Sequence, residues 1–161
     1  MRRRVIAAAA LALVAGASCG TGSDASGHFR VERGGRRATT LLDEPGRAEY
    51  CPSESLLTII ATGRQGAAGF AVRTILPLAQ ARAFAVQPVL AGVGSATAAF
   101  RLPSGAARLG TAGQLRLQPS VAVDGEFDVT VPDSAGRTVQ FKGRLTHIPL
   151  RTGTPTRCSS V

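Results

Sequence analysis

Hydrophobic and polar residues alternate in short runs along most of the chain after residue 27, and Gly, Pro and Ser separate the runs. Residues 29–32 show the two-residue period of a strand with one buried face, and 56–62 is an apolar, β-branched run. Residues 78–85 contain enough alanine to fit a short helix as well as a strand. The pattern predicts an all-β fold, either a single β-sandwich or a small antiparallel β-barrel of about seven to nine strands.

The clearest unit is a hairpin near the end of the chain. Apolar residues of 123–131 share one face and carboxylates share the other, and 139–145 repeats the pattern with basic residues. Pairing Val129 with Val139 buries the apolar face and matches the charges. In that register the other opposite pairs are Phe127 and Phe141, Glu126 and Lys142, Asp124 and Arg144, and Gly125 and Gly143. The facing glycines indicate a bend, a bulge or the close approach of another element.

The first residues have the pattern of an export signal. Three arginines, residues 2–4, precede an apolar run over 5–17 and a pair of small residues before Cys19. A basic start, a short apolar stretch and small residues before the cut are typical of a secretory signal peptide. The run is too short to span a bilayer. We therefore predict a signal peptide over 1–18, a flexible Gly/Ser/Thr-rich tether over 19–27 and a β domain over 28–161.

Ala17, Ser18 and Cys19 also resemble the lipobox of bacterial lipoproteins. The resemblance covers only residues 2–20, and it implies that Cys19 is the acylated first residue of a membrane-anchored protein. Gly20 after the cysteine would favour the outer membrane, on its periplasmic face, in a Gram-negative cell. The alternative is cleavage after Ala17 at an A-x-A site, which would release a soluble protein that starts at Ser18.

Lipidation of Cys19 would leave two cysteines, Cys51 and Cys158. In an oxidising compartment these two are expected to form a disulfide bond. The competing interpretation is a catalytic cysteine with His147 as its base, but the sequence shows no feature that would lower a thiol pKa.

The basic composition does not indicate nucleic-acid binding. The formal net charge is +9, and removal of Arg2, Arg3 and Arg4 leaves 16 basic and 10 acidic residues. Nearly all the basic residues are arginine, which matches the bias of a GC-rich genome, and aromatic residues make up only 4%. Base-stacking platforms need more aromatic side chains. We expect no nucleic-acid partner.

Candidate chemistry is sparse. Two histidines, His28 and His147, lie far apart, and neither HExxH nor CxxC occurs. The carboxylates Asp124, Glu126 and Asp128 could hold Ca²⁺ or act as an acid and base, but basic residues on the facing strand favour a salt-bridged surface. No catalytic residue, cofactor or metal site is predicted.

The expected function is a non-enzymatic binding or structural role in the cell envelope. The partners would be the membrane, through Cys19, and an envelope protein or an apolar ligand. Two alternatives remain: a small envelope hydrolase that uses His147 with a serine or carboxylate, and a carrier of lipid or another hydrophobic ligand inside a barrel.

Overall fold

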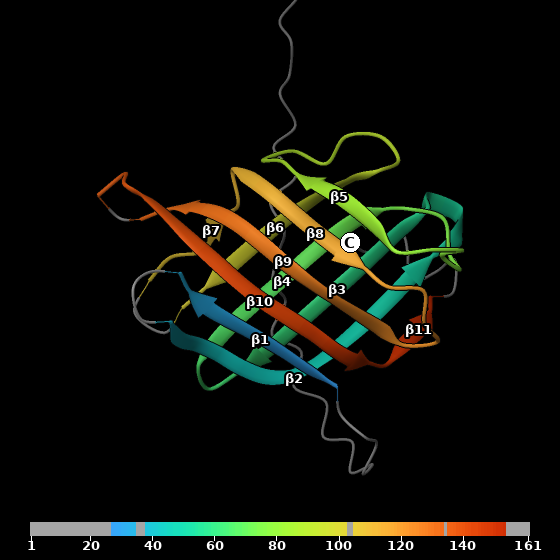
Figure 1. Ribbon diagram of the computed structural model, residues 1–161, viewed down its shortest axis with the longest axis horizontal. Helices are drawn as coiled ribbons and strands as arrows, with labels where there is room; N and C mark the ends of the chain where they lie inside the picture. Colours follow the sequence, from blue (N-terminus) through green and yellow to red (C-terminus); the bar gives the residue numbers. More distant parts are fainter. Residues whose placement is uncertain (1–26, 35–37, 103–104, 134, 154–161) are drawn as a thin grey trace, which may run out of the picture.

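The structure, a computed structural model, describes residues 27–34, 38–102, 105–133 and 135–153 (Figure 1). Strands dominate these residues, and a single short 3-10 helix, η1 (Pro52–Glu54), interrupts them. Among the described residues, no helix has the length and apolarity needed to cross a bilayer. The strands are β1 (His28–Arg33), β2 (Thr39–Cys51), β3 (Leu56–Gly63), β4 (Gly66–Arg73), β5 (Arg82–Val86), β6 (Ser95–Arg101), β7 (Arg108–Leu109), β8 (Ala112–Leu117), β9 (Val123–Pro132), β10 (Thr138–Ile148) and β11 (Leu150–Thr152).

Nine strands close into a barrel. Their order is β1-β10-β9-β8-β5-β6-β4-β3-β2, and β1 also pairs with β2, so the sheet returns to its first strand. The short strands β7 and β11 add to β6 and β2 from outside this ring. Of the two architectures that the sequence left open, the barrel is therefore confirmed, and its strand number lies within the predicted range.

Most strand pairs are antiparallel, as predicted, but two are parallel: β5 with β6, and β11 with β2. The stretch that could have been a helix contributes β5, which starts at Arg82, while residues 74–81 form an irregular loop. Phe84 and Val86 point inward from β5 and are buried. Burial of these side chains overrides the helical propensity of the alanines around them.

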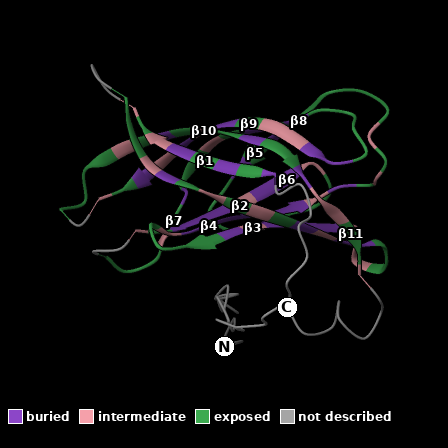
Figure 2. Ribbon diagram, turned by 90° about the horizontal axis from the view of Figure 1, so that it is seen from below, coloured by how far each residue is buried: buried purple, intermediate pink, exposed green. Residues whose placement is uncertain are grey.

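Aromatic rings fill the barrel interior. Phe70 is fully buried, and its ring centroid lies 5.9 Å from Phe29, 6.2 Å from Phe100 and 5.0 Å from Phe127. Phe141 extends the cluster at 5.1 Å from Phe100. These separations are typical of favourable ring contacts. The alternation along most strands thus places the large residues inside, whereas β4 is buried at every position between its two ends; Figure 2 shows the buried segments in purple.

The two ends of the barrel differ. One, named here the η1 end, has η1, the ends of β2, β4, β8 and β10, and the loops 74–81, 87–94 and 118–122. Leu76 and Leu78 of the first loop pack against the core and close this mouth, and the N–H of Leu76 donates to the Tyr50 hydroxyl at 3.3 Å. The other, named the turn end, has the β3–β4 turn and the β9–β10 turn (Figure 1).

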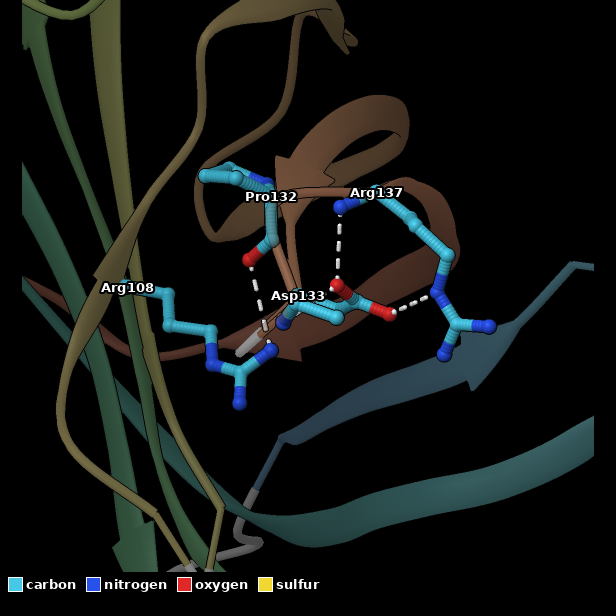
Figure 3. Close-up of polar contacts among 5 residues, drawn as sticks. Arg108, Pro132, Asp133 and Arg137 are labelled. Carbon is cyan, nitrogen blue, oxygen red and sulfur yellow. Dashed lines mark hydrogen bonds and ion pairs between the residues drawn. The ribbon is translucent and has the colours of Figure 1, made fainter.

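The register of the last hairpin differs from the prediction by two residues. Val129 pairs with Phe141 rather than Val139, Phe127 with Gly143, and Gly125 with Leu145. The cause lies in the turn, where the Asp133 carboxylate accepts a hydrogen bond from the N–H of Ala135 at 2.8 Å and one from the N–H of Arg137 at 2.8 Å, the second of which is drawn in Figure 3. This Asx-type turn opposes Asp133 to Arg137. A shift of two keeps every side chain on its predicted face.

The two glycines of this hairpin confirm the expected close approach, although they do not face each other. A Cβ on Gly143 would overlap the Phe127 ring and the Arg30 carbonyl, and a Cβ on Gly125 would overlap the Arg116 carbonyl. Phe127 therefore fills the space that a side chain on residue 143 would take. Glycine at 143 thus leaves room for the Phe127 ring in the register that the turn sets.

Candidate functional site

A shallow depression of about 620 Å³ lies on the outer face of β1, β10, β9 and β8. These four strands are neighbours in the sheet, and their outward residues are mostly charged. We call this depression the charged groove. Its lining comprises Arg30, Glu32, Gln114, Arg116, Glu126, Asp128, Lys142 and Arg144, together with Phe127 and Gly143.

Strand pairing arranges the charged groove in two rows. The first row places Arg30 directly opposite Arg144, with Glu126 next and Arg116 beyond it. Like charges directly opposite each other on a sheet are unfavourable. The groove therefore contains an arrangement that does not serve barrel stability.

The charged residues of the second row all have an ion-pair partner. It runs from Glu32 through Lys142 and Asp128 to Gln114. Lys142 Nζ lies 3.2 Å from Asp128 Oδ2, and Arg30 Nη2 reaches across from the first row to Glu32 Oε1 at 2.9 Å. Exposed pairs of this kind contribute about 0–1 kcal/mol each, so a binding partner could exchange them at little cost.

Three charges of the groove form no ion pair within the described residues: Arg116, Arg144 and Glu126. All three side chains are exposed. The predicted pairs of Glu126 with Lys142 and of Asp124 with Arg144 are wrong, because the two-residue shift sets Glu126 opposite Arg144 and Asp128 opposite Lys142. The groove consequently offers two unpaired guanidinium groups beside one carboxylate.

The third member of the predicted carboxylate row, Asp124, has a different position. Its Oδ1 accepts a hydrogen bond at 2.7 Å from the backbone N–H of His147. His147 lies where the β9–β10 register shifts, with a positive φ of 53°. Asp124 thus satisfies a backbone donor that the bulge removes from the ladder, and it is not part of the charged groove.

His147 is exposed, and within the described part of the chain its imidazole makes no hydrogen bond to a serine or a carboxylate. Among the described residues, the His147 imidazole therefore does not meet the serine or carboxylate that the hydrolase alternative requires. His28, by contrast, has its Nδ1 3.3 Å from Asp43 Oδ1, with both side chains well exposed. Sequence reasoning missed this pair because it depends on the register between β1 and β2.

Metal and internal ligand sites find no support in the described ranges. These residues contain no group of three or more His, Cys, Asp or Glu placed to hold a metal ion. The apolar depression at the η1 end is small, about 20 Å³. A ligand pocket usually has about 300–1,000 Å³, so the aromatic filling of the barrel does not favour the carrier alternative.

Of the three cysteines in the sequence, only Cys51 lies within the described residues. It ends β2, is 5% exposed and packs with Leu56 and Ala71 on the outer side of the barrel. The strand ends there, and η1 starts at the next residue, Pro52. Cys19 and Cys158 lie outside the described residues, as does the signal segment, so lipidation and the Cys51–Cys158 pairing stay predictions.

Comparison with known proteins gives this chain no relative: no family model, no curated protein and no solved structure matches it.

Proposed function

We propose that this protein is an exported bacterial lipoprotein, and that its barrel has a non-enzymatic binding or structural role in the cell envelope. Support for export comes from the arginines and apolar run of residues 2–17, and support for acylation comes from Cys19 after two small residues. Residues 1–18 are then the signal peptide, and acyl chains on Cys19 hold the barrel at a membrane, the outer membrane in a Gram-negative cell.

The observation that carries the binding role is the charged groove. Arg30 and Arg144 stand opposite each other, and neither Arg144 nor Arg116 has an ion pair among the described residues. A carboxylate from a partner between Arg30 and Arg144 would relieve the repulsion and form charge-assisted hydrogen bonds. We therefore propose an envelope protein with exposed acidic residues as the occupant.

We also propose that Cys51 and Cys158 are bridged. Support comes from β11, which runs parallel to β2 and brings Gly153 N within 2.7 Å of the Tyr50 carbonyl. Cys158 follows Gly153 by five residues, and an extended chain of that length reaches about 17 Å. Cys51, next to Tyr50, is thus within reach of the final cysteine.

Intact mass spectrometry of the full chain, purified from membranes, tests the anchor and the bridge together. We expect the mass of a chain that starts at Cys19 and carries acyl groups, with a gain of two hydrogens on reduction. An unmodified chain that starts at Ser18 would contradict the lipoprotein assignment. No mass change on reduction would contradict the bridge.

Charge reversal in the groove tests the binding role. A photo-crosslinking residue in place of Gln114 should capture a defined envelope protein in cells, and Arg144→Glu should reduce that capture by roughly ten-fold, because a repelled carboxylate replaces an attracted one. The matched control is Arg64→Glu in the β3–β4 turn, where the exposed arginine lies outside the groove. Equal capture by both variants would contradict a role for the groove.

A further inference from the structure

The loops of the η1 end are unlike the rest of the surface. Loops 74–81, 87–94 and 118–122 contain no charged residue. They hold four of the five exposed large hydrophobic side chains in the described part of the chain, and the fifth, Leu109, lies in β7. The four, with their exposed fractions, are Ile75 (65%), Val89 (73%), Val93 (56%) and Val121 (92%).

Contacts between the loops hold these segments together at one end of the barrel. Gly94 N donates to the Arg73 carbonyl at 2.8 Å, which joins the end of loop 87–94 to the start of loop 74–81. Loops 74–81 and 118–122 both line the small apolar depression at this mouth. We call the three loops together the apolar rim. An exposed cluster of aliphatic side chains on this scale is typical of a surface that meets a protein or a membrane.

The turn end has the opposite character. Its described residues include Arg64, Arg101, Arg108 and Arg137, one near each turn or strand end. The two ends of the barrel therefore differ: the turn end is rich in arginine, whereas the three loops of the η1 end carry no charge and are flanked by Glu54 of η1 and Arg82 of β5. In Figure 2 the two ends lie at opposite sides of the view, and β11 marks the η1 end.

The chain enters the barrel at the apolar rim's end. Gly27 lies against Ile148, and its carbonyl accepts a hydrogen bond from Gly46 N at 2.8 Å. Only residues 20–26 separate Gly27 from Cys19, so the fully extended connection is about 28 Å long. An acyl anchor at Cys19 would thus keep the η1 end closer to the bilayer than the turn end.

We propose that the apolar rim lies in the lipid headgroup region, with the aliphatic side chains of Ile75, Val89, Val93 and Val121 directed into the bilayer surface. This inference rests on the proposed lipid anchor. Immersion is shallow, because the loop backbones are not hydrogen-bonded in regular structure and must keep contact with water or headgroups. The charged groove, on the side of the barrel, then stays free for a protein partner.

The absence of tryptophan from the chain makes a direct test available. Val121→Trp and Val89→Trp each give the full-length, membrane-purified protein one fluorophore on the apolar rim, and Arg64→Trp gives the matched control at the turn end. Each is reconstituted in phosphatidylethanolamine–phosphatidylglycerol vesicles with brominated or ordinary acyl chains. Circular dichroism checks that the variants fold, and intact mass checks acylation.

We expect brominated chains to remove roughly half of the emission of the Val121→Trp and Val89→Trp variants, since side chains at such an interface lie about 5–10 Å deep. Emission of the Arg64→Trp variant should not change. An acylated protein in which all three variants stay unquenched overturns the inference and leaves the anchor intact. If emission of the Val121→Trp variant is blue-shifted but not quenched, residue 121 is covered by protein rather than by lipid, and the inference is overturned. An unacylated chain overturns the anchor and the inference together.

Discussion

Asp133 makes most of its contacts within five residues of the chain. Its carboxylate accepts the N–H groups of Ala135 and Arg137 and lies 2.9 Å from Arg137 Nε, while Arg108 Nη1 donates to the neighbouring Pro132 carbonyl at 3.3 Å (Figure 3). The hydrogen bond from the Arg137 backbone is the largest cause that lowers the pKa of Asp133 below its ordinary value. A carboxylate with a lowered pKa in the folded state stabilises that state while it is ionised.

Asp133→Asn should lower stability at neutral pH and make it less sensitive to acid. The wild-type contribution is present above the unfolded pKa, about 3.9, and is lost as the pH falls through the lower folded-state pKa. Asparagine keeps an acceptor for the backbone N–H groups but loses the charge. Urea midpoints at pH 7 and pH 3 measure the effect.

The control for this prediction is Asp133→Ala, which also removes the acceptor. It should unfold at a lower urea concentration than Asp133→Asn at both pH values. If the two variants have equal midpoints, the hydrogen bonds from Ala135 and Arg137 do not determine the turn, and another contact must set the hairpin register.

Gly143 is the residue at which a methyl group should be most harmful to the hairpin. Gly143→Ala would push the new Cβ into the Phe127 ring and the Arg30 carbonyl. Overpacking of this kind costs about 1–3 kcal/mol in free energy of unfolding. Gly92→Ala is the matched control, because nothing lies within 4 Å of its added Cβ, and it should change stability by less than about 0.5 kcal/mol. Equal midpoints in urea for the two variants would contradict the packing argument.

At the scale of strands, the sequence correctly predicted which side chains point into the barrel, but it did not predict which residues pair across neighbouring strands. The alternation of Phe127, Val129 and Val131 correctly indicated the inward face of β9, because a side chain's direction depends only on its own strand. The partner of each residue depends on the turn, and the side-chain hydrogen bonds of Asp133 cannot be distinguished in sequence from an ordinary loop. The same two-residue shift in register explains why the predicted ion pairs of the groove are wrong.

Only part of the charged groove could be predicted from the sequence. The facing carboxylates and basic residues of β9 and β10 predict a charged surface. Arg116 joins it through the pairing of β8 with β9, but Arg30 and Glu32 join it only because β1 returns from the start of the chain to pair with β10. Pairing between segments more than 100 residues apart leaves no local pattern, so the closure of the barrel and the width of the groove could not be predicted.

Closure leads to a prediction for β1. Because β1 pairs with β10 on one side and β2 on the other, its amides should exchange with deuterium as slowly as those of β9, which lies between β10 and β8. Mass-spectrometric hydrogen exchange on peptides covering 28–33 and 123–132 compares the two. Fast exchange limited to 28–33 would indicate that the sheet is open between β1 and one of its neighbours.

At the scale of the whole molecule, the aromatic cluster holds the two sides of the barrel together. Phe70→Leu should cost about 1.5–4.5 kcal/mol more than Phe84→Leu, since Phe70 contacts three other rings at about 0.5–1.5 kcal/mol per pair. Phe84 is equally buried but has no ring–ring contact among the described residues. Urea unfolding measures the difference, and similar costs would mean that burial alone determines core stability.

The pairing of His28 with Thr146 and of Phe29 with Leu145 also sets the time at which folding can finish. No early part of the chain can complete the barrel, since β1 lacks one neighbour until β10 has been synthesised. Folds rich in such distant contacts form slowly, in milliseconds to seconds. A chain exported as proposed would therefore stay unfolded while it passes through a narrow translocation channel, and would acquire its final shape only on the far side of the membrane.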